Sequence, residues 1–281
     1  MAVGHSDDVE PLDAIASAIE QCRTALGELQ PQGGVLFSAF GSFDRAILTA
    51  VREAFPAATV MGSTSAAEIS SVDGYQEDSI TLALFASDTV DVTTGLGTGL
   101  SDDVDAACQA AASEALAATR RTPSVCIMLT EGFAADPQRT LDAMARALPA
   151  GVVIVGGTSA ARDFSTVRPS YQFCGDRVTS DGVAVLLFSG PIVASTAVGT
   201  GWHTIGATGI VTSSDYGRLD QIDGRPAIQF LARYLDVTGP ASYGNPLAVV
   251  EAGGDESYFR AIQGTDPASG SVWVAGSIPV G

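Results

Sequence analysis

Two short loops of small, hydroxyl-bearing residues are the first part of the sequence that could do chemistry. Residues 62–67 read Gly-Ser-Thr-Ser-Ala-Ala, and residues 156–161 read Gly-Gly-Thr-Ser-Ala-Ala. The hydroxyl residues that match in both loops are Thr64, Ser65, Thr158 and Ser159. Hydroxyls and backbone N–H groups on loops after strands suit an anionic or zwitterionic small ligand. Because such residues also cap turns very often, a purely structural role stays open.

Charged side chains accompany these loops. Glu68 follows the first loop and Arg162 follows the second, so the two charges could pair with the ammonium and the carboxylate of an amino acid. Arg260, which follows Tyr258-Phe259 in a predicted strand, is a further candidate for a carboxylate contact. An ordinary surface salt bridge is the alternative for each of these charges.

Catalytic and haem-binding alternatives depend on one histidine. Ser159 could act as the nucleophile of a serine hydrolase, although residues 157–161 fall one residue short of the nucleophile-elbow pattern. His5 lies in a start that we expect to be disordered, which leaves His203 as the base, and His203 is also the one plausible axial ligand for haem. A lone histidine beside Trp202 is more often a packed or partly exposed side chain. We therefore expect no catalysis, no metal and no required cofactor, and keep the hydrolase and the haem-based gas sensor as alternatives.

A glycine-rich stretch at residues 95–100 resembles a dinucleotide-binding loop but fails in detail. It reads Gly-Leu-Gly-Thr-Gly-Leu, so Leu100 stands where the final glycine should be. Asp102, Asp103 and Asp105 would place negative charge where a pyrophosphate must sit. We exclude a nucleotide site here.

Composition limits the function classes further. The chain has 281 residues, of which 46% are hydrophobic, enough for one large domain or two joined ones. Its net charge of −18 would repel phosphate backbones, so we expect no nucleic-acid partner. No apolar run approaches the roughly 20 residues of a membrane span, and no export signal is visible. The four scattered cysteines suit reduced core residues, and together these features predict a cytoplasmic protein.

The elements that position the two loops repeat along the chain at an offset of 94 residues. Apolar runs at residues 35–37 and 125–129 lead into helical patterns at residues 44–55 and 137–148, and short strands at 58–61 and 152–155 precede the loops. Downstream, we predict strand pairs at 79–85 with 90–94 and at 182–188 with 192–198. The second copy carries about eight extra residues, which we place within 163–180.

This repeat predicts an α/β fold. We expect internally duplicated units of strand, helix, strand, strand and strand on mixed sheets, with pseudo-twofold symmetry and helices on the outer faces. The two loops would then converge at the carboxyl ends of their strands, where open α/β sheets tend to bind ligands. A further helix at residues 102–119, with Ser101 as its cap, follows the first unit.

A different pattern begins after Gly206. An Asp-Gly turn at 223–224, a helix at 226–235 and a loop at 245–247 before a strand predict a short α+β C-terminal segment. We expect an N-terminal extension and helix at residues 1–30, a duplicated α/β domain at 31–210 and the start of another domain at 211–281.

The order of several motifs supports a family resemblance. After Val60-Met61-Gly62-Ser63-Thr64-Ser65 and Glu68 come Gly201-Trp202-His203, Val211-Thr212 and Asp223-Gly224-Arg225-Pro226-Ala227. The tail adds Asn245-Pro246-Leu247, Arg260, Asp266, Gly270-Ser271 and Ile278-Pro279. The first set resembles the amino-terminal module of the FIST family, and the tail is similar to the opening of its carboxyl-terminal module. The resemblance covers residues 34–281.

The resemblance implies a ligand-sensing protein. Such domains are often coupled to kinase, cyclase or chemotaxis outputs, with amino acids among the suggested ligands and haem suggested for some members. It also implies an apparently truncated FIST C module, because that module normally continues beyond the point where this chain stops. On this basis we expect Val272-Trp273-Val274 to form a strand that little sequence is left to cover.

Overall fold

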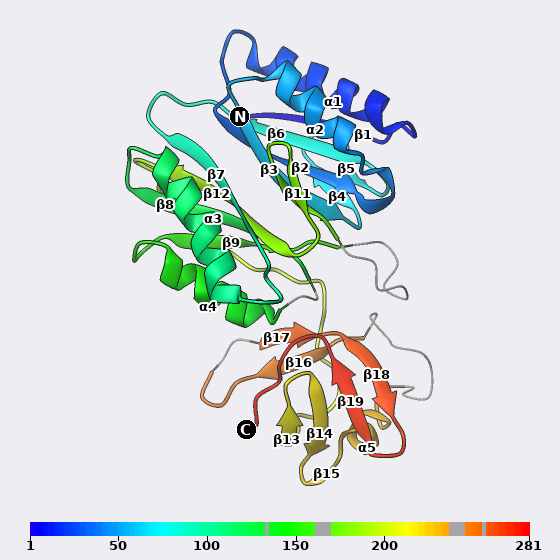
Figure 1. Ribbon diagram of the computed structural model, residues 1–281. Helices are drawn as coiled ribbons and strands as arrows, with labels where there is room; N and C mark the ends of the chain where they lie inside the picture. Colours follow the sequence, from blue (N-terminus) through cyan, green and yellow to red (C-terminus); the bar gives the residue numbers. More distant parts are fainter. Residues whose placement is uncertain (133–134, 161–169, 236–244, 255–256) are drawn as a thin grey trace. The chain divides into compact units, whose positions relative to one another are not determined.

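The computed structural model describes residues 1–132, 135–160, 170–235, 245–254 and 257–281. The chain divides into two compact units, Met1–Thr196 and Ala197–Gly281, which are called the first and second units below. Figure 1 shows helices and two large sheets in the first unit, and mostly strands in the second.

The first unit contains four helices within the described residues. These are α1 (Pro11–Leu26), α2 (Arg45–Ala54), α3 (Val104–Ala118) and α4 (Pro137–Ala147), with a short 3-10 helix at Phe40–Ser42. Its strands are β1 (Ala2–Ser6), β2 (Gly33–Ala39), β3 (Thr59–Ser65), β4 (Glu68–Ser70), β5 (Gly74–Gln76), β6 (Ile80–Phe85), β7 (Asp91–Thr98), β8 (Pro123–Thr130), β9 (Val153–Thr158), β10 (Gln172–Cys174), β11 (Arg177–Thr179) and β12 (Gly182–Ser189).

The strands form two mixed sheets with the same connections. The first sheet has the order β1-β6-β2-β3-β10-β11, and the second has the order β7-β12-β8-β9. In each, a strand and a helix lead into a parallel pair, β2 with β3 or β8 with β9, and a later strand, β6 or β12, lies between the first strand and that pair. The first sheet continues beyond β3 with β10 and β11. The mixed α/β class is confirmed, and the pseudo-twofold axis stays a prediction.

The two sheets face each other between two layers of helices (Figure 1). One core cluster joins α1 and α2 to the first sheet, and another joins α3 and α4 to the second. A third cluster contains buried side chains of both sheets, among them Met61, Leu129 and Leu186. The helices are held mainly by these apolar faces, since an isolated helix of this length is marginal in water.

Three of the predicted details are wrong, two of them within the repeat. Residues 2–6 are strand β1, whose side chains are mostly buried, where we expected disorder. The segments 79–85 and 90–94 do not pair, because β6 joins the first sheet and β7 joins the second. No strand forms at residues 192–198, where Val193 and Val198 are fully exposed. A run of β-branched residues favours a strand but does not supply a partner for one.

Three helices of the first unit, α2, α3 and α4, begin at an aspartate that caps them. The side chains of Asp44, Asp103 and Asp136 accept hydrogen bonds from backbone N–H groups in the first turns of α2, α3 and α4. Asp103 therefore caps α3, and the predicted cap, Ser101, is wrong. Ser101 instead bonds the carboxylate of Asp181 through its own N–H and hydroxyl.

The glycine-rich stretch is explained by close packing of β7 on α3. A Cβ atom on Gly95 would lie 2.1 Å from the carbonyl oxygen of Ala111, and one on Gly97 would lie 1.9 Å from that of Ala107. Only glycine allows the helix backbone to approach the strand so closely. These glycines therefore serve packing between the two elements.

The second unit is a small sheet domain. Its strands are β13 (Val211–Asp215), β14 (Arg218–Ile222), β15 (Arg225–Pro226), β16 (Leu247–Val250), β17 (Ser257–Arg260), β18 (Ile262–Asp266) and β19 (Ser271–Val274). The main sheet has the order β13-β14-β19-β18, β15 pairs with β14, and β16 pairs with β17. The Asp-Gly turn is confirmed, with positive φ at both Asp223 and Gly224. The helix predicted at 226–235 is shorter, because α5 spans Ala227–Leu231.

Strand β19 is not left uncovered, contrary to expectation. It pairs with β14 on one side and β18 on the other. Val272 and Val274 are buried in a core cluster that lies entirely within the second unit, while Trp273 is 46% exposed. The described residues of this unit thus form a hydrophobic core of their own.

None of the helices within the described residues combines the length and apolar character needed to cross a bilayer. The four cysteines are buried free thiols in the first unit. Burial raises the pKa of Cys22 and Cys108 to about 11 and that of Cys126 to about 12. Their prediction as core residues is confirmed.

Candidate functional site

The two Thr-Ser-Ala-Ala loops lie side by side in the first unit. Thr64 pairs with Ser38 near the end of the β2–β3 pair, and Thr158 pairs with Thr130 at the end of the β8–β9 pair. Just beyond β9, the backbone N–H of Ala160 donates to the carbonyl oxygen of Thr64 at 3.2 Å. The carboxyl ends of the two strands therefore meet, as the repeat predicted.

Tyr171 holds the first loop in place. The N–H of Thr64 donates to the carbonyl oxygen of Tyr171, and the N–H of Tyr171 donates to the Thr64 hydroxyl, both at 2.9 Å. The Tyr171 ring stacks on Phe40 and Phe43, with centroids 5.8 and 5.5 Å away. The Thr64 hydroxyl therefore joins the two copies of the repeat within the first unit. Because Thr64 is fully buried, this hydroxyl is closed to solvent.

Glu68 is a buried hydrogen-bond acceptor, 3% exposed. Its Oε1 accepts from the Ser65 hydroxyl, and its Oε2 accepts from the Ser79 hydroxyl at 2.5 Å and the Ser79 N–H at 3.3 Å. These bonds tie β4 to the start of β6. Both carboxylate oxygens already have partners, which places Glu68 behind the loop as a support for Ser65.

His5 belongs to the same network, which sequence reasoning missed. Its ring is 1% exposed and lies between the hydroxyls of Ser70, 2.7 Å from Nδ1, and Ser79, 2.9 Å from Nε2. Sequence alone could not find this contact, because 74 residues separate His5 from Ser79. The chain of bonds joins β1, β4 and β6 beneath the first loop.

The second loop rests on another buried polar group. The Ser159 hydroxyl, in a residue 4% exposed, donates to the carbonyl oxygen of Thr130 at 3.0 Å and lies 2.7 Å from that of Ser170. The Ser170 hydroxyl donates to the buried carboxylate of Glu131 at 3.2 Å. Gln172 donates from Nε2 to Ser159 at 2.6 Å.

One atom of this group has no hydrogen-bond partner among the described residues. It is Oε1 of Gln172, whose side chain is 0% exposed. A buried acceptor that has no hydrogen bond lowers the stability of the folded state by about 1–3 kcal/mol. An unpaired acceptor beside two convergent loops marks a place where a bound donor would be stabilised.

Thr158 gives the loops their accessible hydroxyl. Gly156, Gly157 and Thr158 are exposed, and within the described part of the chain β9 pairs with β8 alone. The Thr158 hydroxyl makes no hydrogen bond to a described residue. Ser65, the hydroxyl residue of the first loop, is half-buried and donates to Glu68. The edge of β9 therefore offers a free hydroxyl and backbone groups to a ligand.

The two predicted arginines are not placed in this site. Arg162 lies outside the described residues. Arg260 is in the second unit, where its Nε donates to the Ser277 carbonyl oxygen at 2.9 Å and its Nη1 to that of Phe259 at 3.3 Å. Its guanidinium also lies 4.3 Å from the centroid of the Tyr258 ring.

The described residues give no support for His203 as a catalytic base or as a haem ligand. It lies in the second unit, is exposed and has no hydrogen bond to a described residue. The partners of the Ser159 hydroxyl are a carbonyl, a hydroxyl and an amide, none of which is an imidazole. Among the described residues, no group of His, Cys, Asp and Glu could hold a metal ion.

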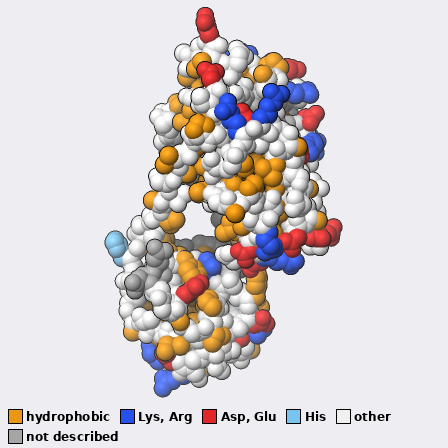
Figure 2. All heavy atoms as spheres, turned by 90° about the vertical axis from the view of Figure 1, so that its left-hand side faces the viewer, with side chains coloured by type: hydrophobic (Ala, Val, Ile, Leu, Met, Phe, Trp, Pro, Cys, Tyr) orange, Lys and Arg blue, Asp and Glu red, His pale blue; other side chains and the backbone are white. Residues whose placement is uncertain are grey.

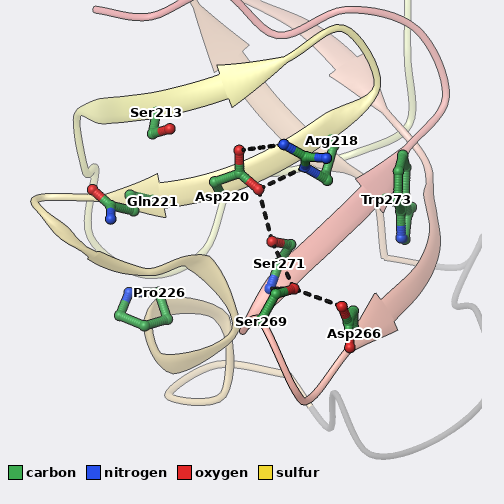
Figure 3. A pocket seen from close by; sticks show the side chains of 9 residues that line it. All are labelled: Ser213, Arg218, Asp220, Gln221, Pro226, Asp266, Ser269, Ser271 and Trp273. Carbon is green, nitrogen blue, oxygen red and sulfur yellow. Dashed lines mark hydrogen bonds and ion pairs between the residues drawn. The ribbon is translucent and has the colours of Figure 1, made fainter.

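A cavity of about 510 Å³ lies in the second unit (Figure 3). None of the seven predicted ligand-binding residues lines it. On the face shown in Figure 2, basic side chains are scattered among acidic ones and form no continuous basic surface over the described residues.

A comparison with protein families gives a match that covers most of the first unit. The family model described as the FIST N domain matches residues 33–225, more than half of the chain. The match starts with β2, includes both loops and extends past Thr196 into the second unit. No curated protein matches the chain.

Proposed function

Because this chain belongs to the FIST family, whose domains sense small ligands in signal transduction, we propose that its first unit binds a small zwitterionic metabolite of the amino-acid class, without catalysis. The ligand would lie where the two Thr-Ser-Ala-Ala loops meet. The observation that carries this assignment is the bond between Ala160 and Thr64 inside the matched segment.

The unpaired acceptor of Gln172 supports an ammonium group on the ligand. An N–H donor reaching Oε1 would recover the free energy of the unmade bond, and ammonium groups donate without accepting. Glu68 would contribute indirectly by orienting Ser65. The assignment thus moves the ammonium contact from Glu68 to Gln172.

The carboxylate of the ligand would lie towards the edge of β9. Thr158 offers an exposed hydroxyl there, and the adjacent glycines leave the backbone accessible. Arg162 follows this loop in sequence and is retained as the charged partner on that argument alone. Arg260 lies in the second unit, where its guanidinium already has two carbonyl partners, so it is left out of this first-unit site.

A non-catalytic role agrees with the surroundings of Ser159. Its hydroxyl donates to the Thr130 carbonyl oxygen, and no base among its described partners could accept its proton. We propose that the ligand instead changes how the protein contacts a signalling partner in the cytoplasm, such as a kinase or cyclase output module. Neither a cofactor nor a metal is needed for that role.

The proposal is tested by a thermal-shift screen of the full chain against the twenty amino acids and related metabolites, because a ligand that binds the folded state raises the melting temperature. For a compound that binds, Thr158→Val should weaken affinity about fivefold to tenfold, the value of one neutral hydrogen bond. Gln172→Leu should weaken it at least as much. Arg162→Ala should weaken it most, by roughly a hundredfold, since a bond to a charged group contributes up to about 3 kcal/mol.

Thr122→Val is the matched control, because Thr122 is also an exposed threonine of the first unit with no side-chain hydrogen bond to a described residue. It should leave affinity unchanged. If an identified ligand binds equally well to the Thr158, Gln172 and Arg162 variants, the site lies elsewhere. Labelling of Ser159 by a fluorophosphonate probe would contradict the non-catalytic role.

A further inference from the structure

The cavity of the second unit is built by residues from five strands and one turn. Its lining residues are Ser213, Arg218, Asp220, Gln221, Pro226, Asp266, Ser269, Ser271 and Trp273. They come from β13, β14, β15, the end of β18, the following turn and β19. A volume of about 510 Å³ is in the range of small-molecule sites.

The polar side chains at the centre of Figure 3 are linked to one another. The Arg218 guanidinium binds the Asp220 carboxylate through two N–H groups, at 2.8 and 3.2 Å. The Ser271 hydroxyl donates to Asp220 at 2.7 Å, and the Ser269 hydroxyl donates to Asp266 at 2.7 Å. The hydroxyl hydrogens thus point at carboxylates. The lining therefore offers a ligand mostly oxygen lone pairs, which accept hydrogen bonds.

The charges of the lining favour a cation. Arg218 neutralises Asp220, whereas the donors to Asp266 among the described residues are neutral and include the Ala268 N–H and the Ser269 hydroxyl. The hydrogen bonds of Arg218 and Ser271 lower the pKa of Asp220, and those of Ser269 and Ala268 lower the pKa of Asp266. Both carboxylates are therefore charged at neutral pH, and the cavity carries a net negative charge.

An aromatic wall completes the cavity. Trp273 stands at one side and Pro226 at the other (Figure 3), and 46% of the Trp273 surface is exposed. The Arg218 guanidinium already lies 5.9 Å from the centroid of the Trp273 ring. Indole is the aromatic group that attracts cations most strongly, and its apolar body can also cover part of a ligand.

We propose that this cavity binds a small organic amine. Its ammonium group would donate to the carboxylates of Asp220 and Asp266, and its apolar body would pack against Trp273 and Pro226. The acceptor-rich lining and the net negative charge disfavour an anion, and the net charge together with the exposed indole favours a cationic amine over a neutral ligand. This site is built from residues other than those of the first-unit site and does not depend on it.

The two tryptophans allow a direct test. In the full chain with Trp202→Phe, Trp273 is the one remaining indole, so its fluorescence reports on the cavity. Titration with benzylamine at pH 7 should change the emission with saturation. Benzyl alcohol, which has the same ring without the charge, should bind at least tenfold more weakly.

Asp266→Asn removes the charge but keeps an oxygen that can accept from the Ala268 N–H, so the local turn should survive. It should weaken benzylamine binding at least tenfold, whereas Asp88→Asn, which changes an exposed carboxylate of the first unit, should have no effect. Trp273→Leu, followed by calorimetry, should weaken binding several-fold. The proposal is overturned if benzyl alcohol binds as well as benzylamine, if Asp266→Asn leaves binding unchanged, or if no saturable change occurs.

Discussion

The buried cysteines show how single residues respond to their surroundings. Desolvation holds all four thiols in the neutral form, and the pKa of Cys126 reaches about 12. A thiol in the unfolded chain has a pKa near 8.5. Because the pKa of these thiols is higher in the folded chain than in the unfolded chain, their contribution to the free energy of unfolding is complete below about pH 8.5. It is lost as the pH rises through the pKa values of the folded chain.

We therefore predict that the free energy of unfolding falls between about pH 9 and pH 12. Each unit of pKa difference corresponds to about 1.4 kcal/mol per thiol, and no other residue type needs to titrate for the loss to begin. Denaturant unfolding at a series of pH values measures it. A variant with all four cysteines replaced by alanine should lose this slope, and a parent protein whose stability is flat over this range would contradict the prediction.

The residues of the candidate site could be predicted only in part. Hydroxyl residues in two matching loops are visible in the sequence, because repetition needs no knowledge of the fold. Their partners are not visible, since Thr64 bonds a residue 107 positions away and His5 bonds one 74 positions away. His5 looked like part of a polar tail because its apolar neighbours in β1 are few and small.

At the scale of elements, the packing of strand β7 on helix α3 is sensitive to added volume. Gly97 lies where a Cβ would approach the Ala107 carbonyl oxygen of α3 to 1.9 Å. Gly97→Val should therefore lower the free energy of unfolding by about 3 kcal/mol or more, because either α3 or β7 must shift. Gly157→Ala in β9 is the control, since its Cβ would meet nothing within 4 Å. Equal stability of the two variants would show that the packing of α3 on β7 tolerates added volume.

The helices were predicted more reliably than the strand pairing. Apolar residues at helical spacing indicated α2 and α4 within two residues of their observed ends, because burial of one face decides such helices. The helix predicted at 102–119 is α3, also within two residues of its ends. Strand partners depend on the whole chain. Residues 79–85 and 90–94 are neighbours in sequence, yet they belong to different sheets, because β12 supplies the partner of β7 from about ninety residues further on.

At the scale of the whole molecule, each unit has its own hydrophobic core. The three clusters of the first unit and the single cluster of the second share no buried residue. The segment matched by the FIST N model nevertheless ends at Arg225, inside the second unit. The end of the first unit, Thr196, and the end of the family match, Arg225, therefore predict different places where the chain can be shortened and still fold.

We predict that a chain ending at Thr196 folds alone and unfolds cooperatively, because its three core clusters remain whole. A chain ending at Arg225 keeps Leu219 and Ile222 but loses the strand partner β19 and its buried valines. It should bind a hydrophobic dye more strongly and aggregate more readily. Circular dichroism melting and dye fluorescence compare the two chains. If instead the longer chain is monomeric and dye-free while the shorter one fails to fold, residues 197–225 complete the first unit and the boundary follows the family match.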